Sequence, residues 1–124
     1  MSVDVHPFPR DGTPIGLLAA ANLLPPLAGL GDLQVAYMLV APSCEAGTNL
    51  PLHLVHAVML ALALGGGLCG WVAWRRVGID RPHSDAGRAS RSRFFALVGM
   101  LSTLLFVLVI VAQWLADFAL SPCQ

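Results

Sequence analysis

The sequence predicts an all-α integral membrane protein with three transmembrane helices. Its composition is strongly apolar: hydrophobic residues make up 56% of the 124 residues and charged residues only 11%, whereas a soluble domain carries about a quarter charged residues. Three long apolar segments follow one another along the chain, and each meets the roughly 20 residues that a helix needs to cross the hydrocarbon core of a bilayer. Because backbone polar groups in lipid must be satisfied within the segment, we expect each of them to be helical.

Polar stretches separate the apolar segments and set the expected organisation of the chain. The third span is the clearest, because residues 94–112 contain no charged side chain. We expect an N-terminal segment at 1–14, transmembrane helices at 15–41, 50–74 and 94–120, connections at 42–49 and 75–93, and a short tail at 121–124. The N-terminal segment has no basic region, so we expect it to stay in the mature protein rather than to be cleaved as part of a signal peptide.

Two adjacent prolines interrupt the first span. In one interpretation, residues 15–41 form a single tilted helix that is kinked at Pro25 and Pro26, which helices in membranes tolerate. In the other, residues 15–24 lie in the membrane interface and the span begins with Pro26 in its first turn. We favour the kinked helix.

The distribution of arginine predicts the orientation in the membrane. All seven basic residues are arginines, and six of them lie between the second and third spans. The connection at 42–49 and the tail at 121–124 carry no basic residue. The positive-inside rule therefore places the arginine-rich connection and the N-terminus in the cytoplasm, and the C-terminus outside, in the periplasm of a bacterial inner membrane. The net charge of zero gives no general attraction for nucleic acid.

Small and polar residues form lines along two of the spans. Small residues spaced four apart let helix backbones approach closely in a membrane. We expect these lines to be helix-packing interfaces, within the bundle or against a partner. The first line consists of Asn22, Gly29, Asp32 and Ala36, and the second of Ala57, Ala61, Gly65, Cys69 and Ala73.

Among the polar side chains within the apolar spans, we single out Asp32, Gln34, Gln113 and Asp117. An acid near the centre of the bilayer is costly, so Asp32 is expected to face protein or water. A single acid without a basic partner makes a poor proton relay, so we expect Asp32 to be protonated or hydrogen-bonded to a neighbouring helix. Gln113 and Asp117 lie one turn apart and can bond each other or a neighbour.

Two of the three cysteines, Cys44 and Cys123, follow proline-containing turns on the side predicted to be outside, where disulfides persist. We expect them to form a disulfide, and two free thiols are the alternative. His53 and His56 open the second span on the same side. The two histidines and two cysteines together would suit Cu(I) or zinc, but we favour no metal because the spacing is short.

Several short segments, in order along the chain, carry a resemblance to a known group of proteins. They are residues 23–27 with the double proline, 33–37, Cys44, His53 or His56, 70–76, the pair Arg93 and Phe94, 108–113, and the final Pro122 and Cys123. In their order and spacing the chain resembles small three-helix bacterial membrane proteins that accompany haem-copper cytochrome c oxidases. The likeness covers most of the chain and departs at Gly31 and Asp32, where that group is expected to have an aromatic residue or a histidine. The resemblance implies an accessory or assembly partner of an oxidase.

The sequence contains no Ser/His/Asp arrangement, no paired carboxylates and no phosphate-binding loop. Together with the spare packing lines, this favours a non-catalytic accessory subunit of a respiratory membrane complex, most specifically a cytochrome c oxidase. We expect its partners to be membrane lipid and other transmembrane subunits, with haem and copper in the partner and no cofactor, nucleic acid or small-molecule substrate of its own. The alternatives are a copper-handling assembly factor that uses Cys44, His53, His56 and Cys123, and a small oligomeric transporter built around Asp32.

Overall fold

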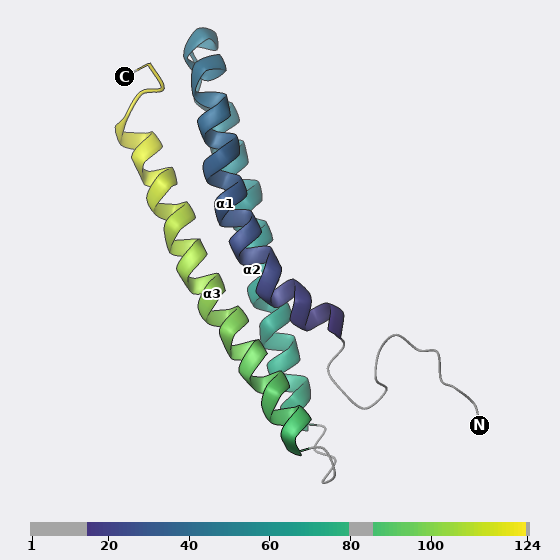
Figure 1. Cartoon of the computed structure of the whole chain (residues 1–124). Helices are drawn as coiled ribbons and strands as arrows, with labels where there is room; N and C mark the ends of the chain where they lie inside the picture. The colour runs from purple at the N-terminus through teal and green to yellow at the C-terminus, as the bar shows by residue number, and fades with distance from the viewer. Residues whose placement is uncertain (1–14, 80–85, 124) are drawn as a thin grey trace, which may run out of the picture.

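The computed structural model describes residues 15–79 and 86–123, and three helices account for nearly all of them. Helix α1 spans Ile15–Ala46, α2 spans Leu50–Ile79 and α3 spans Ala86–Ala119. They lie side by side, and each packs against the other two (Figure 1). All three are long and apolar enough to span a membrane. The all-helical fold with three membrane spans that the sequence predicts is therefore confirmed.

The helices extend beyond the apolar segments that define the spans. Helix α1 continues past residue 41 to Ala46, so only residues 47–49 connect it to α2. The predicted connection at 75–93 is helical on both sides, because α2 continues to Ile79 and α3 already begins at Ala86. Hydropathy marks the part of a helix that lies in hydrocarbon, whereas arginine and alanine also favour helix in water. The predicted N-terminal segment at 1–14, residue Arg81 and residue 124 lie outside the described residues.

The double proline lies inside α1, which is continuous from Ile15 to Ala46. This agrees with the kinked single helix rather than with a separate interfacial segment, and the first turns of α1, drawn in purple, point away from the axis of the rest (Figure 1). Pro25 has no N–H to bond the carbonyl of Ala21, one turn earlier. The Asn22 side chain also bonds at this level, since its Nδ2 donates to the carbonyls of Leu18 at 2.8 Å and of Phe95 on α3 at 3.1 Å.

A tight turn joins α1 to α2. Gly47 has a positive φ of 67°, and its N–H donates to the carbonyl of Cys44 while the N–H of Thr48 donates to that of Ser43, each at 3.2 Å. These two bonds form a Schellman motif, which satisfies the last carbonyls of a helix and needs a left-handed residue that glycine adopts without strain. Helix α2 begins directly afterwards, with Pro51 in its first turn, where no N–H is required.

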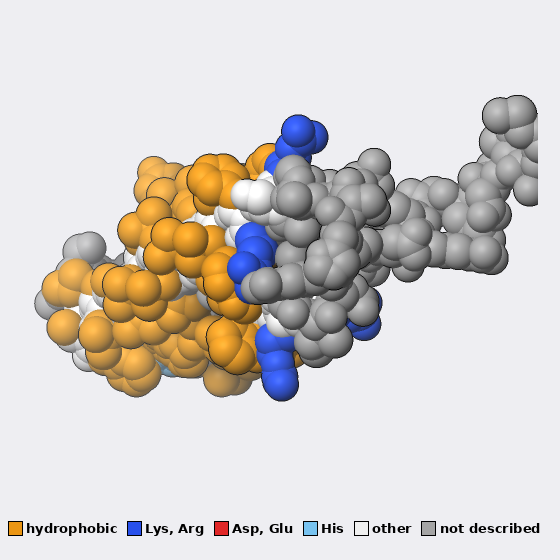
Figure 2. All heavy atoms as spheres, turned by 90° about the horizontal axis from the view of Figure 1, so that it is seen from below, with side chains coloured by type: hydrophobic (Ala, Val, Ile, Leu, Met, Phe, Trp, Pro, Cys, Tyr) orange, Lys and Arg blue, Asp and Glu red, His pale blue; other side chains and the backbone are white. Residues whose placement is uncertain are grey.

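The outer surface of the bundle is apolar over most of its length. Leu33 on α1, Leu68 on α2 and Leu104 on α3 are each more than half exposed in the isolated chain. Figure 2 shows this apolar surface ending at a belt of arginine side chains. Such a surface is suited to lipid or to other membrane helices. We call this end the arginine end, and the opposite end, where Cys44 and Cys123 lie, the disulfide end.

Three consecutive glycines on α2 have three different neighbours. A methyl group added at Gly66 would lie 2.7 Å from the ring of Pro25 on α1. One added at Gly67 would lie 2.6 Å from the methyl group of Thr103 on α3. One added at Gly65 would meet no atom within 4 Å. Gly66 and Gly67 therefore let side chains of α1 and α3 lie directly against the backbone of α2. The side of α2 at Gly65 has no such neighbour among the described residues.

Candidate functional site

One titratable side chain from each helix meets in the half of the bundle nearer the disulfide end. Asp32 lies on α1, His56 on α2 and Asp117 on α3, and we call them the Asp–His–Asp triad. Asp32 and His56 are buried, with 0% and 1% of their side chains exposed, whereas the side chain of Asp117 is 27% exposed. Buried polar groups in a low dielectric must be paired to be tolerated, and the three helices pair them here with one another.

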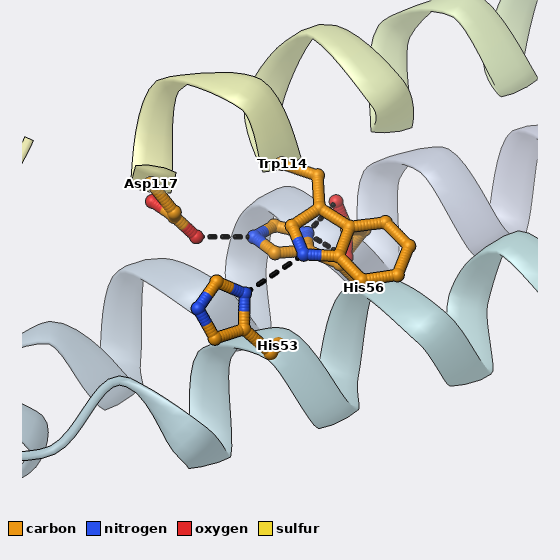
Figure 3. A network of polar contacts seen from close by, with 5 residues as sticks. His53, His56, Trp114 and Asp117 are labelled. Atoms are coloured by element: carbon orange, nitrogen blue, oxygen red, sulfur yellow. Dashed lines mark hydrogen bonds and ion pairs between the residues drawn. The ribbon is translucent and has the colours of Figure 1, made fainter. Parts of the chain in front are cut away.

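The imidazole of His56 bridges the two carboxyl groups. Its Nδ1 lies 2.8 Å from both Oδ1 and Oδ2 of Asp32, and its Nε2 lies 2.6 Å from Oδ2 of Asp117 (Figure 3). The symmetric contact with two oxygens fits an Nδ1–H that donates to a carboxylate. The Nε2 contact is the shorter of the two, and short hydrogen bonds are typical where one partner is charged. Asp32 therefore has the hydrogen bond to a neighbouring helix that the sequence predicts, and its partner is a base.

An aromatic cluster covers the triad. The ring of Trp114 stacks on that of His56, with centroids 6.1 Å apart and planes inclined by 29°. The indole N–H of Trp114 donates to Nδ1 of His53 at 2.8 Å (Figure 3). Phe118 packs on His53 with centroids 4.7 Å apart. Because the indole nitrogen can only donate, Nδ1 of His53 must carry a lone pair. His53 is therefore neutral in this arrangement, with its proton on Nε2.

The disulfide that the sequence predicts is present. The sulfurs of Cys44 and Cys123 are 2.08 Å apart and the residues are 79 positions apart in the sequence. The bond ties the end of α1 to the segment after α3, which holds two of the three triad helices together close to the site. Cysteines joined to each other cannot bind a metal as thiolates, so the structure does not assemble Cys44, His53, His56 and Cys123 into a metal centre. In the described part of the chain, no three His, Cys, Asp or Glu side chains are placed to hold a metal ion.

The first predicted packing line lies inside the bundle. Gly29 is buried, and a methyl group added there would overlap the ring of Phe106 on α3. Asn22 bonds the backbone of α3, Asp32 belongs to the triad, and Ala36 is half-buried. This line therefore joins α1 to its own neighbours and is not a face for a partner.

The second predicted line turns mostly outward. Ala73 is buried and Cys69 half-buried, but Ala57 and Ala61 are exposed and Gly65 faces open space. The residues of α2 that face the bundle lie one or two positions away: Leu52, His56, Ala63, Gly66, Gly70 and Ala73. Adjacent positions on a helix differ by about 100° around its axis. Because small residues occur both on the predicted line and on the neighbouring line that faces the bundle, their spacing does not show which face of α2 turns inward.

The sequence analysis singled out all the members of the triad without joining them. It left Asp117 to bond either Gln113 or a neighbouring helix, and Asp117 contacts His56 on the neighbouring helix α2. It considered His56 in a Cys/His set without favouring a metal there, and it did not foresee that His56 contacts two carboxyl groups. The signal that would have joined the three is their placement, since each apolar span holds at least one titratable residue that must find a polar neighbour.

Comparisons with protein-family models, with curated proteins and with solved structures gave no match to this chain. The class of the protein is therefore defined by its own structure: a membrane protein of three apolar helices, closed by a disulfide at one end and holding a buried triad of titratable side chains.

Proposed function

We propose that this chain is a non-catalytic accessory subunit of a bacterial respiratory membrane complex, a haem-copper cytochrome c oxidase, which it stabilises or helps to assemble by helix packing. In this proposal the N-terminus is cytoplasmic and the disulfide end is periplasmic. The haem and copper belong to the partner, and this chain contributes transmembrane helices and no cofactor.

The observation that carries the proposal is the unused small-residue face of α2. Gly66, Gly67 and Gly70 already serve close packing inside the bundle. Ala57 and Ala61 are exposed on the outside, and a methyl group added at the half-buried Gly65 would meet no atom of the described residues within 4 Å, so these three offer the same kind of surface there. Lipid tails pack against large apolar side chains as well as against small ones, whereas a helix backbone gains contact only where side chains are small. A second transmembrane helix therefore fits this face better than lipid does.

Two features of the sequence support the finer part of the proposal. The resemblance to small membrane proteins that accompany haem-copper oxidases names the complex. The arginines of the arginine end, of which Arg75, Arg76 and Arg91 are exposed, support an inner-membrane orientation with that end in the cytoplasm.

The proposal is tested by filling the outer face of α2 without touching the bundle. Ala61→Leu places a larger side chain on the exposed line, and Ala112→Leu makes the same change on an exposed position of α3. Each tagged variant is expressed at native level in the cell of origin, extracted in mild detergent and separated on a native gel. Loss of one close helix contact, on the order of 1–2 kcal/mol, predicts roughly tenfold less Ala61→Leu chain in the oxidase band, with Ala112→Leu unchanged. Equal recovery of both variants with the oxidase would contradict this interface.

A further inference from the structure

The hydrogen bonds of the Asp–His–Asp triad fix how many protons it holds. Both ring nitrogens of His56 lie within hydrogen-bond distance of carboxyl oxygens, and each contact needs one proton between its two heavy atoms. With both N–H protons of His56 removed, the imidazolate and the two carboxylates together carry three negative charges. When the triad holds two protons, its net charge is therefore −1. This holds whether the second proton resides on Nε2 or on Asp117. A third proton makes the triad neutral.

The one partly exposed member of the triad lies nearest the disulfide end. Asp117 lies two residues before the end of α3 and is the partly exposed member, whereas His56 and Asp32 are buried. Toward the arginine end, the next layer of the bundle is an apolar cluster of Ala28, Ala63 and Ile110. Ala28 lies one turn from Asp32 on α1, and the other two lie about two turns from their triad residues on α2 and α3, all in the same direction.

Two polar side chains beyond that layer, Thr103 and Asn22, are bonded to backbone. The hydroxyl of Thr103 donates to the carbonyl of Gly99 at 2.9 Å, and the amide of Asn22 donates to the carbonyls of Leu18 and Phe95. Among the described residues, the hydrogen bonds of the triad therefore end at Asp32 and do not continue toward the arginine end.

We propose that Asp32, His56 and Asp117 form a proton-binding site that exchanges one proton with water at the disulfide end. A hydronium ion gives its proton to the carboxylate of Asp117, an O–H bond forms there and a water molecule leaves. The imidazolium of His56 then stays paired with the single carboxylate of Asp32, and the site becomes neutral. Release reverses the step and restores one negative charge. The site stands on the contacts of this chain and does not depend on the partner proposed above.

Among the described residues, the charged groups that face the site from the three helices are those of the triad itself. From α1 the facing group is Asp32 itself, and Glu45 lies three turns further on, exposed at the helix end. From α2 the facing groups are His56 and His53, and His53 is held neutral by the indole of Trp114. From α3 the facing group is Asp117. The described arginines with placed side chains, Arg75, Arg76, Arg91 and Arg93, all lie at the arginine end.

Infrared spectroscopy of the full-length chain in lipid nanodiscs tests the proposal. With 13C-labelled aspartate, the carbonyl stretch of protonated Asp is followed from about pH 8 to about pH 5, a range in which aspartates with ordinary pKa values stay ionised. The wild type is expected to gain a band for about one protonated Asp per chain. Asp117→Asn and Asp32→Asn are expected to lack it, because one carboxylate already balances the imidazolium. Glu45→Gln, a change at the same end outside the triad, is expected to keep it, and Asp117→Glu is expected to keep the uptake of about one proton, measured with a pH-indicator dye.

Two results would overturn the proposal. An identical Asp band in the wild type and in Asp117→Asn, with the disulfide and helix content of the variant intact, would make the triad a static structural contact. A pH jump applied from the arginine end of uniformly oriented protein in liposomes that protonates the triad as fast as one from the disulfide end would make it a conduit. Asp32→Asn serves as the second variant if Asp117→Asn does not fold.

Discussion

Replacing Gly66 by alanine places a methyl group between α1 and α2 at the double proline. The added carbon would lie 2.7 Å from Cδ and 2.9 Å from Cγ of Pro25, and 3.1 Å from Cβ of Leu24. Carbon atoms in contact prefer about 3.5–4.0 Å, so the helices must separate by about 1 Å or distort. The proline ring cannot rotate away, and such overpacking costs about 1–3 kcal/mol.

Gly65→Ala is the matched control, one position away on the same helix. Its methyl group meets no atom within 4 Å. Both substitutions gain the same intrinsic helix preference of alanine over glycine, about 1 kcal/mol. The difference between the two variants therefore isolates the packing term, and we predict that Gly66→Ala is less stable than Gly65→Ala by about 1–3 kcal/mol.

Reversible unfolding of the full-length chain in mixed micelles of mild detergent and SDS, followed by tryptophan fluorescence with the disulfide intact, measures this difference. It corresponds to a ratio of roughly 5 to 150 between the two unfolding equilibrium constants. Equal stability of the two variants would show that α1 does not approach α2 at Pro25, and would refute the packing described for this face.

Three further predictions address the covalent link, the orientation and the aromatic cover. Replacing Cys44 and Cys123 by serine opens a loop of 79 residues and lowers the free energy of unfolding by at most about 4.5 kcal/mol on the chain-entropy account; unreduced native protein that alkylates at both cysteines would contradict the bond. In a Cys69→Ala background, an impermeant thiol reagent added to intact cells should label Thr48→Cys and spare Ser90→Cys; the reverse pattern would invert the proposed topology. Trp114→Phe keeps the stacking but loses the indole hydrogen bond, so it should cost about 1 kcal/mol in the same micelle titration, and no change would mean that the bond is not formed.

The spans of this fold follow from the sequence because hydropathy and length are sufficient to define a membrane helix. The disulfide follows as well, because both cysteines lie next to span ends on one side. The helix ends do not follow, since α2 and α3 continue through Arg75, Arg76 and Arg91, residues that hydropathy assigns to a connection. Helix outside the bilayer obeys intrinsic preference rather than hydrophobicity.

The sequence analysis did not assemble the triad, because its contacts join residues 24 and 61 positions apart. Their meeting depends on which face of α2 turns inward, and two neighbouring faces carry small residues. Burial of Asp32 decides between these faces, because its carboxyl needs a polar partner and only the face with His56 provides one on α2 at that level. The buried Asp32 thus determines which face of α2 turns toward the bundle, which the small residues of α2 alone do not determine.

The measurement that tests the accessory-subunit proposal most directly is copurification at native expression. The tagged full-length chain is extracted from its own membranes in mild detergent, and the native complex is examined by its visible spectrum and by identification of its subunits. We predict that the chain migrates with a cytochrome c oxidase whose haem spectrum it shares, and that the chain separated from that complex has no haem or copper signal. A chain that migrates alone, or one that keeps its own haem or copper after separation, would contradict the account.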